Sequence, residues 1–259
     1  MADESLDYAE RWLIDSLRVL RPSAVSYQTT VDMMHGLEQL EQLRRAGTSA
    51  TATHLLVRAA ARAFAANPSL HQLIVGTRRH RPSRVDIGLS ITGETFLAPV
   101  LILEGADKKS LEQLAEEMAR RAPEVQREER ERLRTLRRWG WLLPFGFLRR
   151  AVMRRLFGSG EFRQKTAGTF QVSTVPVESA ATTVFVASGV LVGGQVRSRV
   201  VAVDGHAVVR PTMILTLSGD HSVWDGRAAA RFLAAVKSDL EMPAQEVVAA
   251  STTAVHPEF

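Results

Sequence analysis

The residues of this chain best suited to chemistry form a seven-residue run, Asp-His-Ser-Val-Trp-Asp-Gly, at positions 220–226. It places His221 four residues before Asp225, between an alternating stretch and an amphipathic one. A neutral imidazole at a junction of strand and helix can take a proton from a thiol or hydroxyl group. We expect Asp225 to fix the loop through backbone hydrogen bonds or a buried ion pair, and Gly226 to permit the sharp turn. The spacing alone also suits a structural corner histidine.

The elements around this run alternate between helices and strands. Apolar spacing, caps and breakers predict helices over residues 6–20, 33–45, 53–66, 227–240 and from 111 past 118. Strand-like composition predicts strands over residues 25–31, 85–91, 96–103, 168–173, 183–187 and 212–218, with a connection near residues 200–203. Gly193-Gly194 reads as a turn rather than a phosphate loop. Because strict βαβ repetition is missing, the order predicts an α/β fold of the α+β two-layer type, with a mixed sheet covered by helices.

Composition narrows the class of protein and of site. The chain has 259 residues, 45% of them hydrophobic and 24% charged, which indicates a globular fold with a substantial core. It has no cysteine, which excludes disulfides, thiolate metal sites and cysteine nucleophiles. The six histidines other than His221 show no metal-ligand spacing, so we expect no metal: His35, His54, His71, His80, His206 and His256. The acidic start and the lack of a long apolar run predict a cytoplasmic protein without a membrane span.

Positive charge gathers in one segment. Residues 127–165 hold twelve basic and four acidic residues, whereas the rest of the chain is mildly acidic. Within it, residues 132–157 place pairs of arginines on both sides of an aromatic and apolar centre. This composition is typical of an element at an anionic membrane surface. Two alternatives stay open: the centre packs as a lid on the domain or a neighbouring subunit, or the segment binds an acidic partner. No base-reading motif accompanies the charge, so we expect no nucleic acid.

Several segments together resemble one known family. Residues 211–233 are similar to the active-site segment of the 2-oxo acid dehydrogenase acyltransferases, the dihydrolipoamide acyltransferase catalytic domains with a chloramphenicol acetyltransferase-like fold. Further stretches agree with that family in order and spacing: residues 85–91, 97–100, 106–111, 168–173, 203–205 and 209–211. The resemblance covers roughly residues 13–241. It predicts one catalytic domain over 1–241, with a basic and aromatic insert at 127–166, and a flexible tail over 242–259.

The resemblance implies roles for particular residues. It implies a trimer with active sites at subunit interfaces, where His221 of one subunit faces Ser173 of its neighbour. His221 would then be the general base, and Ser173 would donate a hydrogen bond to the carbonyl oxygen of a thioester. Coenzyme A or acyl-coenzyme A would be a substrate, bound by residues that the sequence does not identify. Ser173 could equally be an ordinary half-buried strand serine.

The chain departs from the family in three ways. Ser222 stands where the family usually has arginine, the segment from Ser173 to Thr183 is short and lacks its Asn-Pro element, and the insert replaces a short polar connection. None of the four lysines lies in a lipoyl-type hairpin: Lys108, Lys109, Lys165 and Lys237. The acyl group would therefore come from a small thioester or an acyl-carrying partner protein.

These observations predict a stand-alone acyltransferase that moves an acyl group between coenzyme A and a thiol, hydroxyl or amine acceptor. It would be a homotrimer or a larger homo-oligomer, in the cytoplasm or peripheral to a membrane. One alternative is a catalytically degenerate oligomeric scaffold or membrane-associated assembly protein that kept the fold. Another is a related condensing or thioester-hydrolysing enzyme.

Overall fold

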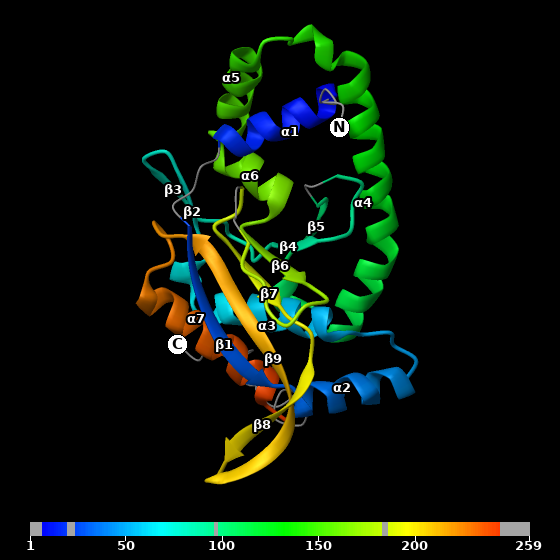
Figure 1. Ribbon diagram of the computed structural model, residues 1–259, viewed down its shortest axis with the longest axis vertical. Coiled ribbons are helices and arrows are strands. Elements are labelled where there is room, and N and C mark those ends of the chain that lie inside the picture. The colour runs from blue at the N-terminus through cyan, green and yellow to red at the C-terminus, as the bar shows by residue number, and fades with distance from the viewer. Residues whose placement is uncertain (1–6, 20–23, 96–97, 183–185, 244–259) are drawn as a thin grey trace, which may run out of the picture.

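A mixed sheet forms the centre of the molecule (Figure 1). The computed structural model describes residues 7–19, 24–95, 98–182 and 186–243. The seven strands of the sheet are β1 (Ala24–Asp32), β4 (Ile87–Ser90), β5 (Val100–Leu103), β6 (Phe170–Thr174), β7 (Gly189–Gly193), β8 (Arg197–Val203) and β9 (His206–Asp220). Their order is β1-β9-β7-β6-β4-β5, and β8 pairs with β9. Strands β4, β6 and β7 are parallel and the other pairs antiparallel, so the predicted mixed sheet is confirmed.

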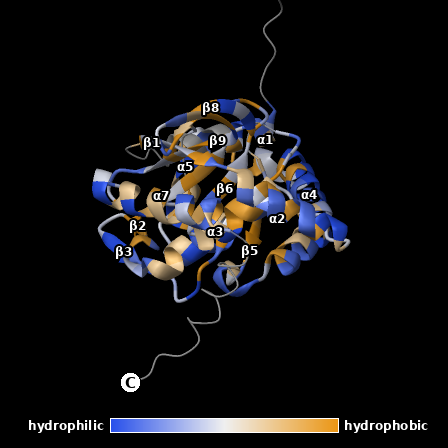
Figure 2. Cartoon of the chain, turned by 90° about the horizontal axis from the view of Figure 1, so that it is seen from below, coloured by the Kyte–Doolittle hydropathy of each residue, from blue (hydrophilic) through white to orange (hydrophobic). Residues whose placement is uncertain are grey.

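Helices cover the sheet and extend beyond it. They are α1 (Tyr8–Val19), α2 (Met34–Arg45), α3 (Ala52–Ala66), α4 (Leu111–Trp139), α5 (Gly146–Phe157), α6 (Gly160–Ala167) and α7 (Gly226–Glu241), with short 3-10 turns η1 (Pro68–Leu70), η2 (Ala106–Lys108) and η3 (Gly140–Leu142). A small hairpin pairs β2 (Leu73–Val75) with β3 (Arg78–His80). Figure 2 shows apolar residues along the central strands and a largely hydrophilic α4.

An aromatic cluster joins helices α3 and α7 to the sheet. Its members are Phe64, Phe170, Trp224 and Phe232, all fully buried, with ring centroids 4.8–6.1 Å apart. All six pairs are tilted or edge-to-face, the arrangements that aromatic quadrupoles favour. The cluster ties the start of α7 to β6, so the corner before α7 rests on the most rigid part of the core.

The five predicted helices are confirmed, but α4 is much longer than expected because it continues into the insert as far as Trp139. The strand predicted over 183–187 is wrong at residues 186 and 187, because residues 186–188 are bends. Residues 183–185 lie outside the described residues. The strand is instead β7, which includes Gly193, so the turn expected there is wrong too. All five β7 residues are buried, which removes the alternation that marks a half-buried strand. A Cβ on Gly193 would lie 2.4 Å from Leu56 Cδ1.

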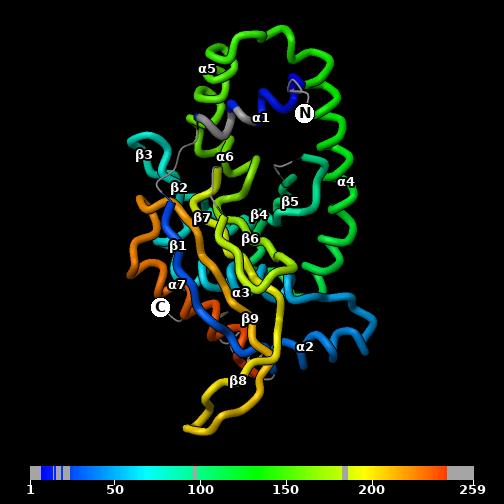
Figure 3. The backbone as a smooth tube through the Cα atoms, in the orientation of Figure 1, coloured from blue at the N-terminus to red at the C-terminus, as the bar shows by residue number. Residues whose placement is uncertain are grey.

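The connection expected near residues 200–203 is instead part of strand β8, which pairs with β9, the strand predicted over 212–218, in one long hairpin. It turns at Asp204-Gly205, both with positive φ, and projects from the end of the sheet (Figure 3). An Asp-Gly pair favours this two-residue turn because both positions tolerate left-handed backbone. Strand β5 starts at Val100, later than expected, and residues 96–97 lie outside the described residues.

The insert forms an arch of helices above the sheet (Figure 1). Helix α4 carries the chain away from β5, η3 reverses it, and α5 and α6 return it to β6. Helix α1 packs across α4, η3 and α5. The return is tight because a Cβ on Gly88 of β4 would lie 2.1 Å from the carbonyl oxygen of Ala167. Only glycine lets α6 end so close to the sheet.

Candidate active site at the His221 corner

The corner that carries His221 is closed by hydrogen bonds to Asp220, the last residue of β9. Val223 N and Trp224 N both donate to the Asp220 carbonyl oxygen, each at a distance of 2.9 Å. The Asp220 carboxylate accepts from Ser222 N at 3.0 Å and from Ser222 Oγ at 2.8 Å. Ser222 therefore holds the loop through local hydrogen bonds.

Trp224 anchors this corner to the sheet. Its side chain is fully buried, and Nε1 donates to the Ser188 carbonyl oxygen at 3.0 Å. Asp220 N donates to the same oxygen at 2.9 Å. Gly219 leaves room for the indole, since a Cβ there would lie 2.3 Å from Trp224 Cδ1. The backbone on both sides of His221 is thus fixed by buried contacts.

Asp225 starts helix α7. As its N-cap it accepts a hydrogen bond from Ala228 N at 2.7 Å, and it forms no ion pair with the described residues. Of the two anchoring modes expected for Asp225, the structure contains the backbone hydrogen bond. The role expected of Gly226 is wrong: its φ is not positive, and a Cβ there would meet open space. The turn into α7 therefore does not require glycine.

The imidazole of His221 is solvent-exposed and has no hydrogen-bond partner among the described residues. Burial lowers the pKa of Arg163 in α6, and the negative charge of Asp220 offsets part of this effect. Arg163 Nε also donates to the Phe157 carbonyl oxygen at 2.7 Å. An arginine of the insert therefore interacts electrostatically with Asp220, which sequence reasoning missed.

Ser173 lies on β6, one residue before its end. It is half-buried and pairs in register with Val192 of β7, and its hydroxyl has no hydrogen-bond partner among the described residues. Its neighbours Phe170 and Val172 are buried in the core. Because alternate strand residues point to opposite faces, Ser173 lies on the face away from α3 and α7.

One chain does not bring Ser173 and His221 together. Ser173 is level with Val192, and Val192 with Thr216 of β9, so two strand spacings separate Ser173 from β9. Thr216 lies four residues before Asp220. With a rise of about 3.3 Å per residue and a spacing of about 4.8 Å between strands, the Cα atoms of Ser173 and His221 lie on the order of 15 Å apart. A site that uses both therefore needs two chains.

The other described histidines do not assemble a site. No group of three or more His, Asp or Glu side chains suited to a metal occurs in the described parts of the chain. His54 caps the start of α3, where Thr51 N donates to its Nδ1 at 2.9 Å. His71 is buried against Phe64, and burial lowers its pKa to about 4. His256 lies outside the described residues.

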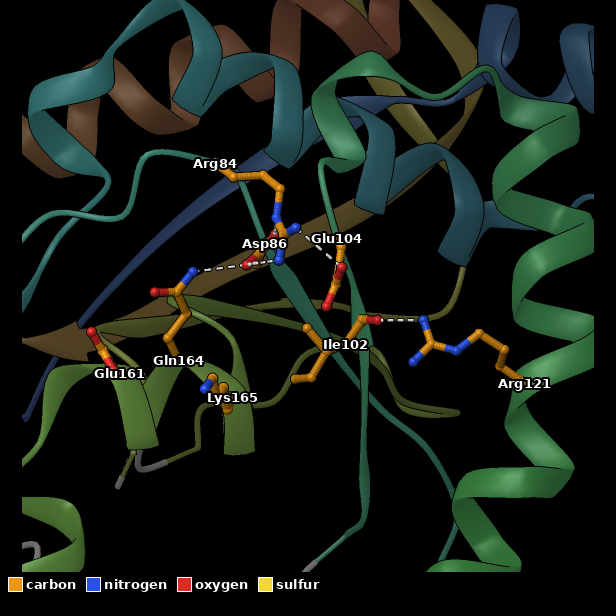
Figure 4. A pocket seen from close by; sticks show the side chains of 8 residues that line it. All are labelled: Arg84, Asp86, Ile102, Glu104, Arg121, Glu161, Gln164 and Lys165. Atoms are coloured by element: carbon orange, nitrogen blue, oxygen red, sulfur yellow. Dashed lines mark hydrogen bonds and ion pairs between the residues drawn. The ribbon is translucent and has the colours of Figure 1, made fainter.

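A polar cavity of about 280 Å³ lies where the insert meets the sheet (Figure 4). Its lining contains as many acidic as basic side chains: Arg84, Asp86, Ile102, Glu104, Arg121, Glu161, Gln164 and Lys165. The buried Asp86 carboxylate accepts from Arg84, from Gln164 Nε2 at 2.8 Å and from Gly105 N at 3.1 Å. Burial would raise the pKa of Asp86, but these bonds lower it. Asp86 thus joins α6 to β4, a structural task that its place in an alternating strand did not reveal.

Comparison with known proteins identifies the C-terminal part by sequence. Residues 171–248 match the family described as 2-oxoacid dehydrogenases acyltransferase (catalytic domain). The dihydrolipoyllysine-residue acetyltransferase component of the acetoin cleaving system of Bacillus subtilis is 30% identical over 239 residues. That alignment covers 88% of this chain and 52% of the relative, so the chain spans about half the length of this relative.

Solved structures extend the likeness to nearly the whole chain. A probable dihydrolipoamide acetyltransferase from Listeria monocytogenes has a TM-score of 0.69 at 18% identity and covers 95% of each chain. The Azotobacter vinelandii dihydrolipoamide acetyltransferase has a TM-score of 0.68 at 21% identity and covers 93% of this chain and 91% of the other. That structure was determined to investigate the roles of a serine, a histidine and an asparagine in the catalytic mechanism of the Azotobacter enzyme. The chain thus has the fold of these acetyltransferases, and its residues 171–248 match the catalytic-domain family of the 2-oxoacid dehydrogenase acyltransferases.

Proposed function

We propose that this chain transfers an acyl group between coenzyme A and a thiol acceptor, at a site shared by two subunits. The proposal rests on the accessibility and the missing hydrogen-bond partners of the His221 and Ser173 side chains. His221 is exposed on a rigid corner and Ser173 is half-buried on the open face of β6, and neither has a hydrogen-bond partner among the described residues. Both are available to a substrate, yet they lie too far apart to act within one chain.

His221 is the base in the proposed reaction. It takes the proton from the acceptor thiol as the sulfur attacks the thioester carbonyl carbon of acyl-coenzyme A. The carbonyl oxygen becomes negatively charged, and the Ser173 hydroxyl of the neighbouring subunit donates a hydrogen bond to it. When the intermediate collapses, the carbon–sulfur bond to coenzyme A breaks and the imidazolium returns the proton to that sulfur. The products are the acylated acceptor and free coenzyme A.

The acceptor that fits best is a dihydrolipoyl thiol, which the names of the relatives specify for those proteins. The lysines of this chain lie in or beside η2, in α6 and in α7, not at the turn of a β-hairpin. The acyl-carrying group would therefore lie outside the residues described here. The assembly we propose is a homotrimer, in which each His221 faces the Ser173 of a neighbouring subunit.

A mixing experiment tests the shared site. His221→Ala and Ser173→Ala chains are purified, mixed under conditions that exchange subunits, and assayed for release of coenzyme A from acetyl-coenzyme A with dihydrolipoamide. Each variant alone should be nearly inactive. Random mixing of equal amounts should restore about one quarter of the wild-type sites, because one interface in four pairs an intact histidine with an intact serine.

Two controls make the outcome decisive. His206→Ala, an exposed histidine on the hairpin, should keep full activity. A mixture of wild type with itself, taken through the same exchange, shows that exchange does not inactivate the site. If the wild type releases no coenzyme A above background, the scaffold alternative holds. If the wild type is active but the mixed variants recover nothing, the shared site is wrong.

A further inference from the structure

The apex of the arch presents apolar side chains to solvent. We call residues 139–147 the aromatic tip. Its exposed members are Trp139, Trp141, Leu142, Phe145 and Phe147, with 50–62% of each residue accessible. In Figure 1 this part of the arch, between α4 and α5, lies farthest from the sheet. The expectation that the apolar centre packs on its own domain is therefore wrong for these five side chains.

Buried contacts hold the aromatic tip in this form. Asp15 of α1, 2% exposed, accepts from Arg149 Nε at 2.8 Å and from Arg150 Nη1 at 3.0 Å. Arg149 Nη1 also donates to the carbonyl oxygens of Leu143 at 3.0 Å and Pro144 at 2.8 Å. One buried guanidinium thus fixes the backbone of the loop from beneath. The polar groups of the loop turn inward while its apolar side chains stay outside.

Arginines surround the aromatic tip without matching acids. Residues 132–160 contain eight arginines and no Asp or Glu. Arg149 and Arg150 pair with Asp15, and Arg137 pairs with Asp7. The exposed arginines 154 and 155 have no ion-pair partner among the described residues. The Arg138 guanidinium lies 5.1 Å from the centroid of the Trp139 ring. The result is an apolar apex inside a positively charged rim.

We propose that the aromatic tip inserts into the interface of an anionic lipid bilayer. Tryptophan and phenylalanine favour the boundary between headgroups and acyl chains, and arginines around them attract anionic headgroups. A contact between the tips of two copies fits less well, because it would bring their arginine rims together. No helix in the described parts of the chain is long and apolar enough to cross a membrane, so the contact is peripheral. This proposal does not depend on acyl transfer.

Flotation with lipid vesicles tests the apolar part. The full chain is mixed with vesicles of phosphatidylcholine, with or without phosphatidylglycerol, and should float only with the anionic ones. Trp141→Glu/Phe147→Glu should lower the partition coefficient at least about tenfold, because two charged groups would enter the interface. Leu37→Glu/Val177→Glu adds the same two charges at exposed apolar residues elsewhere and should float nearly as well as the wild type.

The rim has its own matched pair of variants. Arg154→Gln/Arg155→Gln should weaken binding about 30-fold, the value expected for removing two arginines near an anionic surface. Arg78→Gln/Arg79→Gln removes the same charge from exposed positions on β3 and should change binding far less. Circular dichroism of each variant checks that it is folded.

Three results would overturn the proposal. The first is a wild type that does not float with anionic vesicles. The second is a tip variant, Trp141→Glu/Phe147→Glu, that floats like the wild type. The third is a change in oligomeric mass for that variant without a change in flotation, which would make the aromatic tip a contact between copies of this chain.

Discussion

The buried His71 makes a sharp prediction about pH and stability. Its residue is 4% exposed, its ring lies 5.2 Å from that of Phe64, and its Nε2 has no hydrogen-bond partner in the described parts of the chain. Burial lowers its pKa from 6.5 to about 4, and the Asp86 carboxylate offsets only part of this effect. The folded protein thus keeps His71 neutral at pH values where the unfolded chain protonates it.

The sign of the effect follows from which state binds the proton. At pH 7 the imidazole of His71 is mostly neutral in both the folded and the unfolded state, so its protonation changes the free energy of unfolding little. As the pH falls through 6.5, the unfolded chain takes up a proton that the folded protein does not, and the free energy of unfolding decreases. The decrease levels off near pH 4, where the folded protein also binds the proton. At about 1.4 kcal/mol per pH unit, the loss over this window is about 3 kcal/mol.

Urea unfolding of the wild type and of His71→Phe from pH 7 to pH 4, at fixed protein concentration, measures this loss. Phenylalanine keeps an aromatic ring against Phe64 and removes the titrating group. The variant should gain about 3 kcal/mol relative to the wild type as the pH falls to 4. His206→Phe, an exposed histidine, serves as the control and should run parallel to the wild type. If the His71→Phe and wild-type curves also stay parallel, His71 is not a buried neutral histidine.

Three further changes probe other contacts. Gly88→Ala should cost more than about 3 kcal/mol or prevent folding, because the backbone oxygen of Ala167 cannot move away; soluble yield and urea unfolding measure it. Asp225→Ala should lose about 1 kcal/mol in thermal unfolding while Asp225→Asn, which can still cap α7, loses little; equal losses would contradict the capping role. Asp15→Asn leaves the Arg149 guanidinium buried without its carboxylate and should cost about 3–5 kcal/mol. Hydrogen exchange should then rise first over residues 137–157, and an increase spread evenly over β9 would argue against a local role.

Local signals predicted the part of the fold that local interactions decide. Ser110 and Gln113 form a capping box at the start of α4, and Asp225 caps α7. The His221 corner was also evident, because a strand, an Asp-Gly pair and an amphipathic helix follow one another along the chain. Each of these features depends on residues only a few positions apart.

Features that depend on distant residues escaped the sequence analysis. Arg149 lies beneath the aromatic tip because Asp15, 134 positions earlier, supplies its carboxylate. Strand β7 was misplaced because its burial on both faces depends on Leu56 and Trp224, which come from other elements. The separation of Ser173 from His221 follows from the pairing of three strands, which the family resemblance implied but residue spacing alone could not give.

Two departures from the family, Ser222 and the insert, meet at the same corner. Ser222 leaves the Asp220 carboxylate with hydrogen bonds but without an arginine at the adjacent position. The insert ends in α6, whose Arg163 interacts electrostatically with that carboxylate and whose Gln164 binds Asp86. Because the same helix is the return limb of the arch, the charge at the His221 corner depends on how the insert is folded. A variant that loosens the insert should therefore disturb this corner as well as the aromatic tip, although neither lies near the other in the fold.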